Sequence, residues 1–133
     1  MDLIRVATVA SSLIDRAAAP KQGDEGAPES TLVFETGFTP ALDGLAPGDE
    51  VLVLTWLDRA SRDVLRVHPR DDPSRPEQGV FATRSPDRPN PIGLHRVTVL
   101  AIEGTRVRVS DLEALDGTPV VDVKPVLGSV DER

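Results

Sequence analysis

The chain has 133 residues, of which 39% are hydrophobic and 28% are charged, and its formal net charge is −7. This is enough apolar material for one packed domain spanning 1–133, and the chain is too short for a second core. The absence of cysteine excludes disulfides, thiolate metal sites and a cysteine nucleophile. With only two histidines, His68 and His95, no metal site is predicted.

Strand-like patterns dominate, and the predicted strands in chain order are 3–9, 32–35, 50–57, 64–68, 79–83, 92–102, 106–109 and 120–124. The segment 50–57 is nearly all apolar and predicts a strand buried on both faces. Helical patterns are limited to a short turn in 11–19 and one short helix over 40–45 that begins with proline. Turns rich in Gly, Pro and Asp separate the strands.

This pattern predicts an all-β, mainly antiparallel fold: a small closed or partly closed β-barrel with one or two short helices. A Rossmann sheet is disfavoured because the spaces between the strands are too short for crossover helices. The sequence also lacks the signatures of P-loop, dinucleotide-binding, serine-hydrolase and zinc-protease sites.

The charge distribution bears on partners and location. A net charge of −7 argues against a broad, sequence-independent grip on nucleic acid. Arginines nevertheless gather in the middle third of the chain, which fits either a local basic surface or an ordinary salt-bridged face. No apolar run approaches the ~20 residues that span a bilayer, and the N-terminus lacks a signal-peptide layout, so a cytoplasmic location is expected.

The segment 84–93 (RSPDRPNPIG) is rigid and polar. It holds three prolines, and each fixes its own φ and keeps the preceding residue extended. A loop that is stiff before binding pays less entropy to order side chains around a ligand. Arg84, Arg88 and Asn90 are therefore candidate ligand contacts, and a plain connector is the alternative.

A second candidate lies within 111–125. Asp116 and Gly117, followed by Thr118 and Pro119, predict a tight turn that leads into a strand. Backbone groups at such a turn can bind an adenine edge or ribose hydroxyls. An ordinary hairpin turn fits the same pattern.

Four further residues have competing interpretations. Asp58 and Arg59 follow the apolar strand and form either the rim of a site or the start of a solvated loop. His95 is interpreted as a packing or surface histidine rather than a general base. Trp56 is interpreted as a core residue.

Two stretches, GVFATRSPDRPNPIGLHRVTVLAIEG (79–104) and DLEALDGTPVVDVKP (111–125), resemble the TsaA-like or TrmO-like family, and the similarity extends over nearly the whole chain. The resemblance implies a compact β-barrel, a homodimer, and binding of S-adenosylmethionine in a manner unlike Rossmann methyltransferases. It further implies methylation of N6 of threonylcarbamoyladenosine beside the tRNA anticodon, which makes the anticodon stem-loop the implied partner. The alternatives are a methyltransferase acting on a small molecule and a non-catalytic S-adenosylmethionine-binding module.

Carried over by position, the resemblance implies cofactor contacts at Pro20, Lys21, Gln22, Asp58, Arg59, Arg84, Leu94, Ala114, Leu115, Asp116 and Gly117. Arg88 and Asn90 are the hypothesised substrate contacts. Asp116 is the candidate proton acceptor by position, followed by Asp122.

Four residues at three places depart from the family pattern. Lys21 stands where arginine is common, Asp58 and Arg59 stand where His-Gln is common, and His95 stands where a small residue is common. Longer bacterial members also carry a C-terminal extension beyond the matching region.

Overall fold

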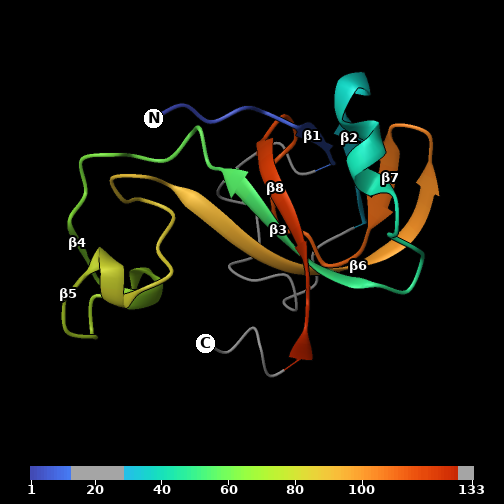
Figure 1. The fold of residues 1–133 in the computed structure, drawn as a ribbon. Coiled ribbons are helices and arrows are strands. Elements are labelled where there is room, and N and C mark those ends of the chain that lie inside the picture. The colour runs from blue at the N-terminus through green and yellow to red at the C-terminus, as the bar shows by residue number, and fades with distance from the viewer. Residues whose placement is uncertain (13–28, 129–133) are drawn as a thin grey trace.

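The structure, a computed structural model, describes residues 1–12 and 29–128. Six strands in these residues close into an antiparallel ring in the order β1-β2-β7-β6-β3-β8, and β8 pairs back with β1 (Figure 1). These strands are β1 (Ala7–Ala10), β2 (Ser30–Phe34), β3 (Glu50–Trp56), β6 (Ile92–Glu103), β7 (Arg106–Val109) and β8 (Pro119–Pro125). The predicted all-β, mainly antiparallel class is therefore confirmed.

The hydrophobic core lies inside the ring because each strand turns alternate side chains inward. In β3, Val51, Val53 and Thr55 are at most 1% exposed, whereas Leu52 and Leu54 on the outer face are only partly buried. The prediction that 50–57 is buried on both faces was therefore wrong. Full burial of such a strand requires the helices that cover a parallel sheet, and an antiparallel ring does not supply them.

The N-terminal strand is shorter than predicted. The pattern of 3–9 predicted a strand, but β1 begins at Ala7, and Leu3 and Ile4 are exposed. The backbone N–H of Val6 donates to the carbonyl of Val120 at 2.9 Å. Pairing thus starts where β8 comes alongside, and apolar residues before that point have no strand to pair with.

The region between β3 and β6 forms a small unit beside the ring (Figure 1). Strands β4 (Arg66–Val67) and β5 (Gln78–Gly79) pair with each other, with the 3₁₀ turn η4 (Pro69–Asp71) between them. The predicted strand over 79–83 was wrong beyond Gly79, because the chain turns into η5 (Val80–Ala82). The backbone N–H of Thr83 donates to the carbonyl of Val80 at 3.0 Å, which closes that turn.

One longer 3₁₀ helix, η3 (Thr36–Leu42), covers an end of the ring (Figure 1). The sequence placed a short helix over 40–45 starting at proline, but Pro40 lies inside η3. The helix starts earlier because the backbone N–H of Phe38 already bonds to the carbonyl of Glu35 at 2.9 Å. The predicted turn in 11–19 falls outside the described residues from position 13 onward.

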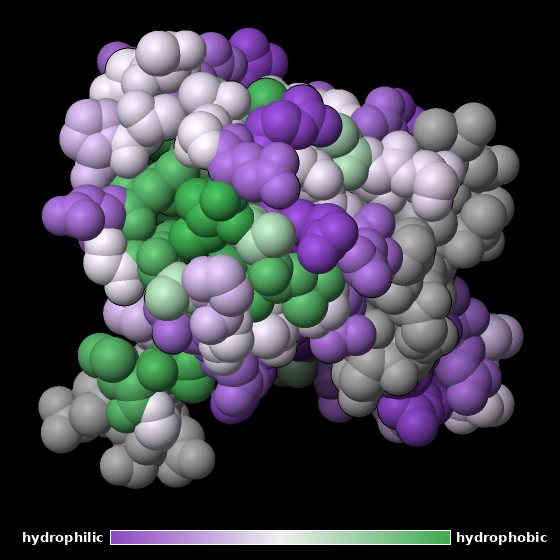
Figure 2. Space-filling view, turned by 90° about the vertical axis from the view of Figure 1, so that its right-hand side faces the viewer, coloured by the Kyte–Doolittle hydropathy of each residue, from purple (hydrophilic) through white to green (hydrophobic). Residues whose placement is uncertain are grey.

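Part of the apolar surface of the ring is uncovered. Figure 2 shows hydrophobic side chains gathered on one face, with polar residues around them. At the start of β6, on the left-hand side of Figure 1, Ile92 and Leu94 are also 43% and 44% exposed. In the part of the chain that the structure describes, no helix is long and apolar enough to cross a membrane.

Candidate functional site

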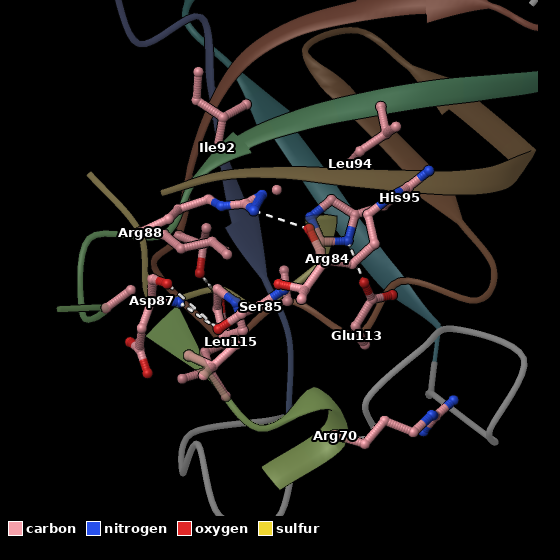
Figure 3. Close-up of a pocket in the computed structure, with 18 of the residues that line it drawn as sticks. Arg70, Arg84, Ser85, Asp87, Arg88, Ile92, Leu94, His95, Glu113 and Leu115 are labelled. Carbon is pink, nitrogen blue, oxygen red and sulfur yellow. Dashed lines mark hydrogen bonds and ion pairs between the residues drawn. The ribbon is translucent and has the colours of Figure 1, made fainter. Parts of the chain in front are cut away.

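A pocket of about 1220 Å³ lies where β3 ends and β6 begins. Its walls come from the loop after β3 (57–60), the proline-rich loop (82–88) and the segment 111–115 before β8 (Figure 3). Strand β3 pairs with β6 over Ile92–Thr98, whereas β7 pairs with β6 only from Val99 onward. The pocket therefore lies along an edge of β6 that no described strand covers.

The proline-rich loop is held from outside by Arg62. Its guanidinium lies 5.0 Å from the centre of the Trp56 ring. Its Nε donates to the carbonyl of Pro89 at 2.8 Å, and its Nη2 donates to Oδ1 of Asn90 at 3.0 Å. The stiffness that the prolines provide is thus supplemented by a contact from a neighbouring loop.

Arg88 holds the same loop from within. Its Nη2 donates to the carbonyls of Val80 and Thr83, and its backbone N–H donates to the carbonyl of Ser61 at 3.0 Å. Its Nε is buried and has no hydrogen-bond partner among the described residues. In this structure the Arg88 side chain therefore contacts the backbone of the preceding turn.

Replacing Arg62 with alanine is expected to loosen the loop. The change removes two hydrogen bonds and the contact with Trp56, and each net hydrogen bond contributes about 1 kcal/mol. We expect amide hydrogen exchange at Ser85, Asp87 and Asn90 to accelerate about tenfold. Arg62→Lys, which keeps the charge but lacks the planar fork, should accelerate exchange nearly as much. Exchange at the wild-type rate in Arg62→Ala would contradict this role.

The structure brings most of the predicted site residues to the pocket. The loops 57–60 and 82–88 supply Asp58, Arg59, Arg84 and Arg88. The other predicted site residues that line the pocket are Leu94, Ala114 and Leu115. Of the two loop arginines, Arg84 is exposed and Arg88 is partly buried. Pro20, Lys21 and Gln22 lie outside the described residues.

The Asp-Gly turn borders the pocket without lining it, since the described lining stops at Leu115 and resumes at Thr118. The carboxylate of Asp116 accepts a hydrogen bond from the backbone N–H of Ser11 at 2.9 Å. The φ of Gly117 is +85°, a value that favours glycine. The predicted tight turn is therefore present, and it ties the strand β8 to β1.

The other candidate residues outside the lining have structural contacts. Oδ1 of Asn90 accepts the hydrogen bond from Arg62 described above. Oδ1 of Asp122 accepts a hydrogen bond from the backbone N–H of Val123 at 2.9 Å, and its Oδ2 lies 3.4 Å from Nζ of Lys124.

A buried histidine connects the interior of the ring with the pocket wall. His95 on β6 is 6% exposed, and its Nδ1 lies 2.5 Å from Oε1 of Glu113 (Figure 3). Its Nε2 lies 2.7 Å from Oγ1 of Thr55. His95 and Glu113 both line the pocket. The sequence did not reveal these contacts, because the partners stand 40 residues before and 18 residues after His95.

Gly93 makes room for this histidine. A Cβ at position 93 would lie 2.3 Å from Oγ1 of Thr55 and 2.6 Å from Nε2 of His95. Both distances are far inside van der Waals contact, so only glycine fits here without displacement of the hydrogen-bonded pair.

An ion pair lies farther along the pocket lining. Nε of Arg96 donates to Oε2 of Glu50 at 2.9 Å, and this hydrogen bond, together with the arginine charge, lowers the pKa of the Glu50 carboxyl below its ordinary value. Within residues 1–12 and 29–128, no group of three or more His, Asp or Glu side chains is arranged to hold a metal ion.

Comparison with known proteins identifies the family to which this chain belongs. The profile of the tRNA-methyltransferase O N-terminal domain matches residues 8–132. The chain belongs to this family. The TrmO-like resemblance carried by the segments 79–104 and 111–125 is thereby confirmed, and these segments form two walls of the pocket.

Two curated archaeal relatives match the chain over most of their own length. A protein of Methanothermobacter thermautotrophicus named "Probable S-adenosyl-L-methionine-binding protein" is 44% identical over 126 residues, which cover 95% of this chain and 90% of the relative. An Archaeoglobus fulgidus protein named "S-adenosyl-L-methionine-binding protein" is 42% identical over 113 residues, which cover 85% of this chain and 80% of the relative.

Solved TrmO structures have the same fold. TrmO from Pseudomonas aeruginosa superimposes with a TM-score of 0.79 at 30% sequence identity, covering 100% of this chain and 59% of that one. Another TrmO crystal structure gives a TM-score of 0.79 at 31% identity and covers 100% of this chain and 60% of that one. The chain thus spans about three fifths of the solved TrmO chains it matches.

Proposed function

We propose that this protein is an S-adenosylmethionine-dependent methyltransferase that acts on tRNA, with N6 of threonylcarbamoyladenosine as the acceptor. The observation that carries the proposal is the pocket itself. The two segments that identify the family both form walls of this one cavity. The curated relatives named for S-adenosylmethionine binding support the choice of cofactor.

The residues present fit this cofactor. The exposed guanidinium of Arg84 can bind a carboxylate in a bidentate manner. The carboxylate of Asp58 offers a negative charge to a cationic group, and Leu57, Ala114 and Leu115 offer apolar contact for a base. Pro20, Lys21 and Gln22 remain predicted contacts. When bound, S-adenosylmethionine supplies a methyl group attached to a positively charged sulfur.

The size of the pocket favours two ligands. Sites for single small ligands measure about 300–1,000 Å³. The pocket here, at about 1220 Å³, exceeds that range and has room for both a methyl donor and a nucleoside acceptor. Holding both in a fixed relative orientation is the main catalytic requirement for a direct displacement. A protein nucleophile is not required.

Fewer residues are proposed to contact RNA than to contact the cofactor. Arg70 lines the pocket from η4, and Arg84 is the alternative contact for a phosphate if it does not bind the cofactor carboxylate. Asn90 and Arg88 remain the predicted substrate contacts. Because the chain carries a net charge of −7, we expect these contacts to be local rather than part of a broad basic surface.

A homodimer and a cytoplasmic location belong to the same proposal. The apolar face shown in Figure 2 provides a surface of the kind that a second copy buries. Because tRNA is the proposed substrate, we propose a cytoplasmic location for the protein.

The decisive experiment is methyl transfer with the purified full chain, methyl-labelled S-adenosylmethionine and tRNA that carries threonylcarbamoyladenosine. We expect label in that nucleoside, detected by mass spectrometry after digestion. The matched control is the same tRNA without the threonylcarbamoyl group, which should take up no label. Donor binding in calorimetry with no transfer to RNA would contradict the proposal and favour a binding module or a small-molecule acceptor.

A further inference from the structure

Six carboxylates line the pocket, and Glu113 differs from the others. The six are Glu50, Asp58, Asp71, Asp87, Asp111 and Glu113. Glu50 is about half exposed and is bonded to Arg96, and Oδ1 of Asp87 accepts the backbone N–H of Ser61 at 2.9 Å. Asp58, Asp71 and Asp111 are exposed. The side chain of Glu113 is 18% exposed and is bound by a buried histidine.

The hydrogen bonds of His95 have a definite direction. An ionised carboxylate can only accept, so Nδ1 of His95 carries the proton in its contact with Glu113. In the neutral ring, the lone pair on Nε2 then accepts the hydroxyl proton of Thr55, which is fully buried. In the β3–β6 register the pair Val53–His95 and the pair Thr55–Gly93 are separated by one pair, so their side chains share one face of the two strands. Backbone pairing therefore holds the His95 imidazole in place, and the imidazole in turn orients the carboxylate of Glu113.

Only one oxygen of Glu113 is engaged in this way. Oε1 receives the His95 hydrogen bond, and Oε2 has no hydrogen-bond partner in the part of the chain that the structure describes. Glu113 lines the pocket, and its carboxylate is drawn beside His95 in Figure 3. A carboxylate with one oxygen fixed and the other open, largely shielded from water, is suited to accept a proton from a bound substrate.

We propose that Glu113 is the catalytic base of the methyl transfer and that His95 and Thr55 are its positioning residues. This rests on the proposed function. The acceptor nitrogen forms a bond to the methyl carbon while the carbon–sulfur bond breaks and its electron pair stays on sulfur. The N–H proton passes to Oε2 of Glu113. The positive sulfonium and negative carboxylate are thereby converted to a neutral thioether and a neutral carboxylic acid, so atoms and charge balance.

The other two candidate bases are less suited to this role. The Asp116 carboxylate is exposed and accepts the backbone N–H of Ser11, outside the described lining of the pocket. The Asp122 carboxylate bonds to its own strand and pairs with Lys124. Neither is directed toward the pocket by a buried partner.

The test is single-turnover methyl transfer by Glu113→Gln. The amide oxygen can still accept the His95 hydrogen bond, so the fold is retained, but glutamine cannot take the proton. We expect the rate to fall about 10²-fold or more, with donor affinity in calorimetry changed less than about threefold. The matched control is Glu103→Gln, which removes the same charge from an exposed glutamate at the end of β6, outside the lining of the pocket. It should transfer methyl at the wild-type rate.

The outcomes separate this inference from the proposed function. If the wild type methylates tRNA and Glu113→Gln does so equally fast, Glu113 is not the base and the proposed function stands. If the wild type transfers no methyl group to any tRNA, both proposals are overturned. If Glu113→Gln and Glu103→Gln slow the reaction equally, the effect is one of general charge, and the assignment of Glu113 fails.

Two measurements address the positioning role. His95→Asn keeps an N–H donor near the place of Nδ1, so we expect it to retain more of kcat than His95→Ala at a similar KM. Equal kcat values for the two variants would overturn the role of His95. In the unliganded wild type, ¹⁵N shifts should report His95 protonated on Nδ1, with a His68→Gln variant to assign the signals. Protonation on Nε2 alone would contradict the arrangement.

Discussion

Gly93→Ala is expected to destabilise the protein by about 2–6 kcal/mol. Overpacking a well-packed interior costs about 1–3 kcal/mol, and disruption of a buried hydrogen bond adds about 1–3 kcal/mol. The new methyl group would lie 2.3 Å from Oγ1 of Thr55, and both groups belong to paired residues of β3 and β6. Neither strand can move without breaking its neighbour's pairing. His95 must therefore shift, and Glu113 loses its fixed partner.

Thermal unfolding measures this effect, and we expect Tm to fall by roughly 10 °C or more. The matched control is Gly37→Ala in η3, where an added Cβ meets no atom within 4 Å and φ is not positive. That variant should unfold within about 1 kcal/mol of the wild type. A Gly93→Ala protein as stable as Gly37→Ala would show that the Thr55–His95 pair can relax at no cost.

Leu112→Ala is expected to cost about 2–5 kcal/mol, because removal of a fully buried leucine side chain leaves a cavity. Leu112 is 0% exposed and belongs to the main core cluster, although it lies outside any strand. It anchors the segment whose next residues, Glu113, Ala114 and Leu115, line the pocket. The loss of this anchor should therefore also weaken binding of S-adenosylmethionine.

Denaturant unfolding and calorimetry test the two effects separately. The control is Leu3→Ala, because Leu3 is 52% exposed and its truncation should change stability by less than about 0.5 kcal/mol. If Leu112→Ala lowers stability but leaves donor affinity unchanged, the segment 111–115 keeps its shape without its anchor. If Leu112→Ala is as stable as Leu3→Ala, the core closes the cavity that the missing side chain leaves.

Both local and distant contacts keep the loop 84–93 rigid. The prolines stiffen 84–93 through covalent geometry alone. Arg62 and Arg88 then attach that loop to the rest of the pocket through backbone carbonyls. A mutation at either arginine should therefore affect ligand binding even where the arginine itself touches no ligand.

Several features of this protein were determined by its sequence alone. Alternation of apolar residues and closely spaced turn residues are local properties, and they identified the antiparallel all-β class and most of the strands. The motifs in 79–104 and 111–125 identified the family, since strings of this length rarely match by chance. The Asp116–Gly117 turn was also predictable, because a positive φ is a local demand that glycine meets.

Other features were decided only by the tertiary structure. The strand expected over 3–9 begins late, because pairing depends on where β8 lies and not on the pattern of its own residues. Glu113 showed no signal in the sequence, since nothing local marks it as the partner of His95. The β3–β6 register and the path of the chain after β7 bring Thr55, His95 and Glu113 together. Hydrogen bonds between residues so far apart in the chain form only once the ring has closed, so no local pattern encodes them.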